Sequence, residues 1–129
     1  MSDQNTTLAD ARSIVSRFVD ERDWKQFHHP KNLAMSIAIE AAELMEHFQW
    51  MSHDEVNRAL SDQDIRAQVT AELADVFSYS LAMANALQID VSEALADKMK
   101  SNEQKYPVEQ YRGRYGPSDK RNVTAREKP

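Results

Sequence analysis

A long segment of the chain, residues 31–106, contains neither glycine nor proline, which strongly limits the possible folds. The chain has two glycines, Gly113 and Gly116, so residues 1–112 contain none. A sheet of several strands needs hairpin turns, which favour glycine at positive φ. Helix interiors avoid both residues, because glycine is too flexible and proline lacks the backbone donor. The sequence therefore predicts an all-α fold, a four- to five-helix antiparallel bundle.

Length, charge and cysteine content exclude several classes of protein. The 129 residues are enough for one domain, and the net charge of -5 argues against a nucleic-acid polymer as partner. No stretch approaches the ~20 apolar residues of a membrane helix, and the polar first ten residues do not resemble a secretory signal. The chain has no cysteine, which rules out thiolate zinc sites and fits a cytoplasmic location.

Apolar residues recur with helical spacing in four long stretches. Pro30 marks a boundary, because the residue before a proline avoids the α region, so Lys31 or Asn32 is expected to open the second helix. Ser52 and Asp90 each stand three residues before a glutamate, the spacing of a capping box. We expect one helical domain over residues 1–112, a disordered basic tail over 113–129, a short helix after Ser52, and long helices over residues 8–23, 31–51, 64–88 and 91–105.

The same periodicity predicts which positions of the two central helices face the core. In the second helix they are Leu33, Ile37, Ala41, Leu44 and Phe48. In the third long helix they are Ile65, Val69, Leu73, Val76, Phe77 and Leu81.

Two acidic pairs border these apolar stripes: Glu40 with Glu43, and Glu72 with Asp75. Residues three apart on a helix point to one side, close enough to share a cation. Solvated helical acids are usually matched by Lys or Arg four residues on, but here those positions hold none. Residues 32–57 and 67–97 contain no Lys or Arg at all, so the sequence supplies no local counter-charge.

Carboxylates beside a core are costly unless they are paired or bind a metal. Their oxygen ligands favour Mg²⁺, with Mn²⁺ as a possible substitute. A solvent-exposed acidic face is the ordinary alternative for such spacing. A di-iron bundle would need Glu-x-x-His motifs on two helices, and none of the four acids has a histidine three residues later.

With these acids in view, the chain resembles the all-α NTP pyrophosphatase (MazG-like) family, in its dCTP pyrophosphatase branch. The acidic motifs alone are generic, whereas the tryptophan, histidine and proline segments around them are more specific. The matching segments are residues 21–33, 40–44, 48–50, 72–76, 98–102 and 105–107.

The resemblance implies a Mg²⁺-dependent hydrolase that converts a nucleoside triphosphate, dCTP or a related pyrimidine deoxynucleotide, to the monophosphate and pyrophosphate. It implies a homo-oligomer, a dimer or a dimer-of-dimers tetramer, with a role in nucleotide-pool sanitation. It further implies Glu40, Glu43, Glu72 and Asp75 as metal ligands and catalytic residues, and as substrate contacts Trp24, His28, Trp50, Tyr79, Lys98 and Asn102.

Other functions stay open at this point. Cytosine-specific members carry a histidine in the first helix where this chain has Val15, so the base could be another pyrimidine or a modified one. Within the superfamily, a dUTP or a phosphoribosyl-ATP pyrophosphohydrolase is the alternative. Outside enzymes, the rival is a helical interaction module whose acidic face binds a basic protein.

Overall fold

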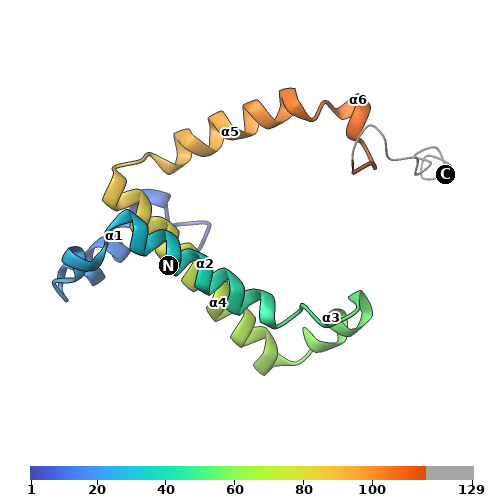
Figure 1. Cartoon of the computed structure of the whole chain (residues 1–129), viewed down its shortest axis with the longest axis horizontal. Coiled ribbons are helices and arrows are strands. Elements are labelled where there is room, and N and C mark those ends of the chain that lie inside the picture. The colour runs from blue at the N-terminus through green and yellow to red at the C-terminus, as the bar shows by residue number, and fades with distance from the viewer. Residues whose placement is uncertain (116–129) are drawn as a thin grey trace. The chain divides into compact units, whose positions relative to one another are not determined.

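The computed structural model describes residues 1–115, which form helices, turns and irregular segments without a strand in that range (Figure 1). The chain divides into two compact units, and the second begins at Asp90. The all-α prediction is confirmed. Within the described part of the chain, every helix is too short or too polar to be a membrane-spanning segment. Most of the predicted tail, residues 116–129, lies outside the described residues.

The first unit, Met1–Ile89, is built on a pair of antiparallel helices. Helix α2 runs toward the short helix α3 and α4 returns alongside it, while α1 packs on α4 (Figure 1). The bounds are α1 Leu8–Asp20, a 3₁₀ helix η1 Trp24–Phe27, α2 Pro30–Glu46, α3 His53–Ala59 and α4 Gln63–Leu87. The second unit contains α5 Val91–Lys105 and α6 Val108–Tyr111, of which α6 was not predicted.

Helix α2 starts and ends earlier than the sequence predicted. It begins at Pro30, because a proline at the first helical position lacks only an N–H that would be unsatisfied anyway. The N-cap is His29, whose Nδ1 accepts a hydrogen bond from the backbone N–H of Lys31 (3.3 Å). The helix ends at Glu46 because the next residues form a turn that brings Ser52 into its extended N-cap conformation. Phe48, predicted on the inner stripe, therefore lies beyond the helix.

The predicted caps form, with one difference. The Ser52 hydroxyl accepts from the N–H of Glu55 (3.3 Å) and the Glu55 carboxylate accepts from the N–H of Ser52 (2.7 Å), a complete capping box. At α5 a single bond forms, in which the Asp90 carboxylate accepts from the N–H of Glu93 (2.9 Å). The start of α4 is capped by Asp62, whose side chain accepts from two backbone N–H groups.

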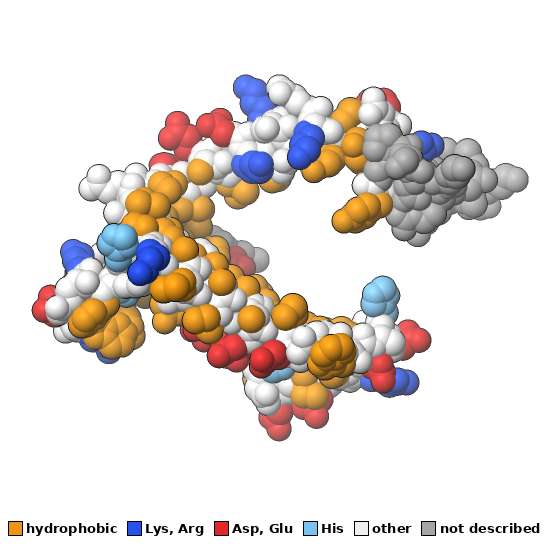
Figure 2. Space-filling model, viewed as in Figure 1, with side chains coloured by type: hydrophobic (Ala, Val, Ile, Leu, Met, Phe, Trp, Pro, Cys, Tyr) orange, Lys and Arg blue, Asp and Glu red, His pale blue; other side chains and the backbone are white. Residues whose placement is uncertain are grey.

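The first unit buries few of its apolar side chains. Leu33 and Leu81 lie inside as predicted, but Leu73 and Phe77 are 57% and 52% exposed. Hydrophobic side chains gather along the visible face of α2, with acidic ones at their edge (Figure 2). Large apolar side chains on α2 and α4 that stay exposed are Met35, Ile39, Met45, Leu73, Phe77 and Leu87. An apolar face of this kind is typical of a surface that another protein covers.

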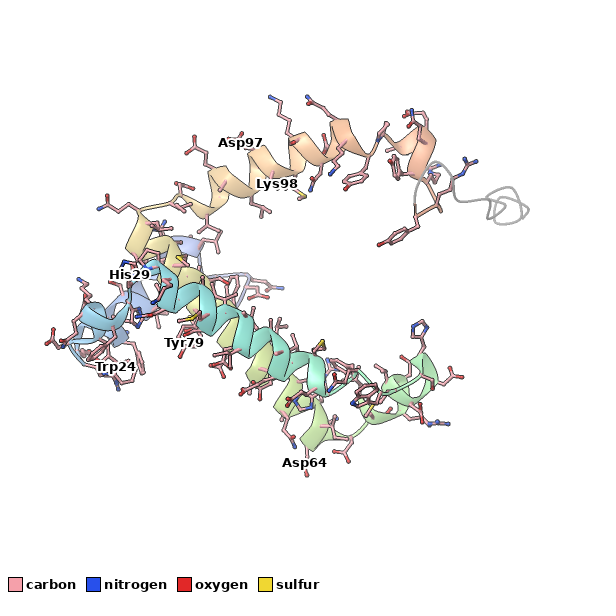
Figure 3. The ribbon with its side chains drawn as sticks, viewed as in Figure 1. Trp24, His29, Asp64, Tyr79, Asp97 and Lys98 are labelled. Carbon is pink, nitrogen blue, oxygen red and sulfur yellow. The ribbon has the colours of Figure 1, made fainter. Side chains whose placement is uncertain are left out.

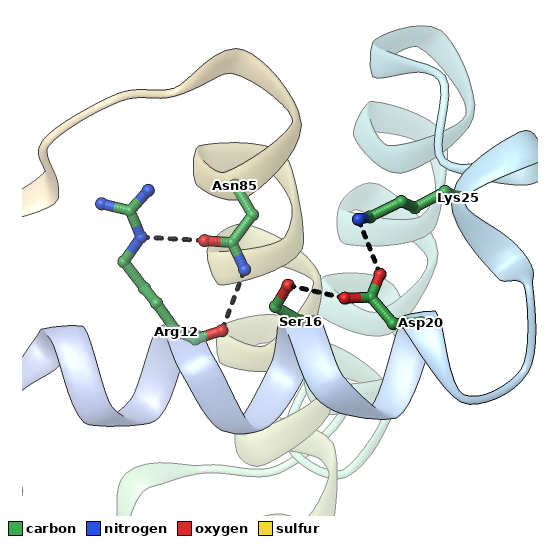
Figure 4. Close-up of polar contacts among 5 residues, drawn as sticks. All are labelled: Arg12, Ser16, Asp20, Lys25 and Asn85. Atoms are coloured by element: carbon green, nitrogen blue, oxygen red, sulfur yellow. Dashed lines mark hydrogen bonds and ion pairs between the residues drawn. The ribbon is translucent and has the colours of Figure 1, made fainter.

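Two side chains join α1 to α4 by hydrogen bonds (Figure 4). Arg12 Nε donates to Asn85 Oδ1 (2.9 Å), and Asn85 Nδ2 donates to the backbone carbonyl of Arg12 (3.0 Å). Both residues are part-buried, so these bonds are only partly replaceable by water. They fix the position of α1 along α4.

We expect Asn85→Ala to lower the free energy of unfolding by about 1–3 kcal/mol, because it leaves a donor on α1 without its acceptor. Chemical denaturation at a fixed protein concentration measures this loss. The matched control is Asn57→Ala, at an exposed position of α3. If the two variants have the same free energy of unfolding, the hydrogen bonds between Arg12 and Asn85 contribute nothing to stability.

Candidate metal centre and adjoining pocket

Three of the predicted metal ligands come together between α2 and α4. Glu40 and Glu43 lie one turn apart on α2, and Glu72 reaches them from the antiparallel helix α4. One carboxylate oxygen from each of the three lies within 4.8 Å of the others. We call these residues the three-carboxylate cluster.

The fourth predicted ligand, Asp75, lies beside the three-carboxylate cluster without joining it. It is exposed and stands one turn after Glu72 on α4. Its charge is near enough to raise the pKa of Glu40. Of the four acids predicted as metal ligands, the structure brings three within ligand distance of one another and keeps the fourth close by.

Negative charge is crowded around Glu40. Its pKa is raised above the ordinary value of 4.5, first by desolvation, then by the charges of Glu43 and Asp75, a hydrogen bond with Glu43, and the charge of Glu72. The ion pairs recorded in residues 1–115 lie elsewhere, between Arg22 and Glu21 and between Lys25 and Asp20. Within that range no basic side chain neutralises the cluster.

The donor set fits a hard divalent cation. The ligands offered are carboxylate oxygens, which suit Mg²⁺ or Mn²⁺. Three carboxylates on two helices leave coordination positions open for water or phosphate oxygens, as Mg²⁺ sites usually require. A bound cation would also offset the mutual repulsion of these carboxylates.

A cavity of about 450 Å³, the α1–α4 pocket, lies between α1, η1 and α4. Asp75 is part of its lining, so the acidic region and the pocket adjoin. Three predicted substrate contacts also line it (Trp24 and Tyr79 are labelled in Figure 3). The residues that line the pocket are Ile14, Val15, Phe18, Val19, Trp24, His28, Asp75, Ser78, Tyr79 and Ala82.

Phe18 lines the α1–α4 pocket and was missed in the sequence analysis. It belongs to the apolar stripe of α1, which reads as core, yet its side chain is 48% exposed. Its ring meets Trp24 edge to face, with centroids 5.7 Å apart. The available signal was the position of Phe18 in the last turn of α1, shortly before Trp24.

The other predicted substrate contacts lie outside this pocket. Trp50 follows α2 in a turn and is 88% exposed. Lys98 and Asn102 lie four residues apart on α5 in the second unit, on one side of that helix (Lys98 is labelled in Figure 3). Their roles stay predictions from the resemblance.

The chain is similar to several known pyrophosphatases. A solved pyrophosphatase from Archaeoglobus fulgidus shares 40% of its sequence with the chain and superimposes with a TM-score of 0.74, over 83% of this chain and 98% of that one. The dCTP pyrophosphatase 1 of Mus musculus is 41% identical over 107 residues, and that of Homo sapiens 38% over 102. The chain spans 63% and 60% of the length of these two curated relatives.

A model of the MazG-like family matches residues 35–115, which include all three carboxylates of the cluster. The match also covers Asp75 and helix α5. The resemblance inferred from the sequence segments is thereby confirmed. The chain belongs to the MazG-like family.

Proposed function

We propose that this protein is a Mg²⁺-dependent nucleoside triphosphate pyrophosphohydrolase that converts dCTP, or a related pyrimidine deoxynucleotide, to the monophosphate and pyrophosphate. The observation that carries the proposal is the position of Asp75, which lies beside the three-carboxylate cluster and also lines the α1–α4 pocket. A triphosphate at the acids can therefore extend its nucleoside into an aromatic cavity. The names of the curated relatives, dCTP pyrophosphatase 1, support the substrate class.

In this proposal the acidic residues bind Mg²⁺ and fix its position. Glu40, Glu43 and Glu72 hold Mg²⁺, and Asp75 completes the ligand set from the pocket side. When bound, Mg²⁺ supplies neutralisation of phosphate charge and a lowered pKa for a water nucleophile. The carboxylates fix its position on two packed helices, which keeps the reacting phosphate and the water oriented.

The pocket residues bind the nucleoside. Trp24 offers a flat surface for stacking, and Tyr79 and His28 offer polar groups at the same cavity. Val15, also in the lining, offers an apolar surface at the position where the resemblance implies a histidine in cytosine-specific members. We therefore include 5-substituted cytosines and uracil among the candidate bases.

Three further residues have roles that rest on the resemblance. Trp50 is proposed as a second wall for the base, and its high exposure leaves its indole free to contact a ligand. Lys98 and Asn102 are proposed to contact the phosphates or the sugar. A cation such as Lys98 suits phosphate binding as a point charge.

The proposal includes a homo-oligomer, a dimer or a dimer of dimers. The exposed apolar side chains of α2 and α4, including Ile39 at 57% and Phe77 at 52%, support it, because a second copy would bury them. Sedimentation velocity should give a mass of two or four chains. A monomer at micromolar concentration would contradict this part of the proposal.

A substrate panel tests the reaction. The protein is incubated with Mg²⁺ and dCTP, 5-substituted dCTPs, CTP, dUTP, the purine triphosphates and phosphoribosyl-ATP, and both pyrophosphate and the monophosphate are quantified. We expect dCTP or a 5-substituted dCTP to give the highest kcat/KM. Preference for dUTP would move the base assignment to the alternative within the superfamily. Failure of every nucleotide to release pyrophosphate would contradict an enzyme and favour the acidic interaction module.

We place the activity in the cytoplasm, where removal of unwanted triphosphates keeps the nucleotide pool clean. The lack of cysteine throughout the sequence is consistent with a reducing compartment.

A further inference from the structure

We propose that Phe18 is a further aromatic wall for the base, beside Trp24 in the α1–α4 pocket, and that Arg22 is a positioning residue that holds Phe18 in place. The inference rests on the proposed function, since it names how that pocket recognises a nucleotide. It adds two residues that neither the acidic motifs nor the predicted substrate contacts include.

Phe18 and Trp24 form an aromatic corner. Their ring centroids are 5.7 Å apart and their planes meet at 77°, the edge-to-face arrangement that aromatic pairs prefer. Both rings line the α1–α4 pocket. Phe18 is 48% exposed and Trp24 43%, so about half of each side chain is available to a ligand. A flat base that stacks on one ring is therefore nearly perpendicular to the other ring and can contact it in an edge-to-face arrangement.

Arg22 holds Phe18 at two points. Its guanidinium carbon lies 3.7 Å from the centroid of the Phe18 ring, a cation–π contact. Its Nη1 also donates to the backbone carbonyl of Phe18 (3.0 Å). Arg22 is absent from the pocket lining, so it covers Phe18 without entering the cavity.

The turn after α1 brings Trp24 back onto Phe18. Asp23 has φ 52 and ψ 37, a left-handed conformation that residues other than glycine adopt at a cost. Gln26 Nε2 stabilises this turn by donating to the carbonyl (2.9 Å) and the carboxylate (3.1 Å) of Asp23. The aromatic corner is therefore fixed before a ligand binds, which lowers the entropy cost of binding.

The corner also orients the nucleotide. Asp75 belongs to the same pocket and lies near Glu40, so the acidic region is on the α4 side of the cavity. Phe18 and Trp24 lie on the α1 and η1 side. A base held in the corner directs its phosphates toward the carboxylates that hold Mg²⁺ in the proposed function.

The test separates binding of the base from binding at the metal. We compare Phe18→Leu with wild type in the Mg²⁺-loaded protein, using dCMP as the base-bearing probe and inorganic pyrophosphate as the probe without a base. We expect Phe18→Leu to weaken dCMP binding and raise KM about fivefold, with kcat and pyrophosphate inhibition unchanged. Phe18→Tyr, which keeps the ring, should restore wild-type values.

Arg22→Met should raise KM two- to threefold, because Phe18 loses its cation–π contact. Arg17→Met is the matched control, since it removes the same charge from an exposed position of α1. Phe27→Leu, at an exposed ring of η1 outside the pocket lining, is the control for Phe18→Leu.

If Phe18→Leu leaves dCMP binding unchanged, or weakens dCMP and pyrophosphate binding equally, the inference is overturned. The proposed function still stands in that case as long as the wild type turns over a triphosphate. If Arg22→Met and Arg17→Met have the same KM, the proposed role of Arg22 in holding Phe18 is overturned. If wild type neither hydrolyses a triphosphate nor binds dCMP, the proposed function fails and this inference fails with it.

Discussion

Glu43→Gln should abolish turnover, with a loss of roughly 10³-fold or more, because it removes one charged ligand from the three-carboxylate cluster. Glutamine has nearly the same size and helix propensity as glutamate, and Glu43 is exposed, so the helical fold should persist. Steady-state rates of pyrophosphate release measure the first effect, and circular dichroism checks the second. Mg²⁺ binding, followed by calorimetry, should weaken in parallel.

Glu46→Gln is the matched control. Glu46 lies on the same helix one turn beyond Glu43, is exposed, and is not part of the cluster. The same loss of charge there should leave turnover near wild type. Normal turnover in Glu43→Gln would show that the metal assignment is wrong.

Trp50→Ala should raise KM on the order of tenfold while it barely changes the melting temperature. Trp50 is 88% exposed, so its removal costs little buried apolar area within the chain. Loss of a stacking surface for the base weakens binding instead. KM for the preferred triphosphate and thermal unfolding at one protein concentration measure the two effects.

Met51→Ala, at the next position of the same segment, is the control and should leave KM unchanged. If Trp50→Ala lowers the melting temperature as strongly as it raises KM, the side chain serves in packing between copies of the chain and the proposed role in base binding is wrong.

Much of the fold could be predicted because it depends on local features of the sequence. The absence of glycine and proline from residues 31–106 excluded a sheet, and the Ser52–Glu55 spacing predicted a cap that forms with both of its bonds. The end of α2 was predicted five residues too late, since Phe48 continues the apolar period into a turn. Apolar periodicity indicates which side chains can face the core, but it does not indicate where a helix ends. The turn after α2 depends instead on the position of the next N-cap.

The candidate site was predictable where it depended on helix geometry. The spacing of Glu40 and Glu43 sets them on one side of α2, and the missing counter-charges indicated a shared cation. Phe18 could not be assigned to the pocket from sequence, because a core stripe and an open pocket wall have the same apolar pattern on α1. Only the turn at Asp23, which returns Trp24 to α1, distinguishes them.

The raised pKa of Glu40 sets the direction of a pH effect on stability. Since the folded-state pKa lies above 4.5, the folded protein holds the Glu40 proton more tightly than the unfolded chain does. The stability that this proton contributes is present below pH 4.5 and is lost as pH rises through the raised pKa. Glu40→Gln, which cannot ionise, should reduce this loss in metal-free protein, as thermal unfolding between pH 4 and 8 would show.

Thermal unfolding as a function of Mg²⁺ concentration at pH 7.5 tests most directly whether a cation neutralises the crowded carboxylates. At a hundredfold excess over Kd, binding to the folded state alone stabilises by about 2.7 kcal/mol, a rise in melting temperature on the order of 10 °C. We expect this rise in wild type and in Glu46→Gln, and its loss in Glu43→Gln. A wild-type melting temperature that does not respond to Mg²⁺ would contradict a metal site at the three-carboxylate cluster.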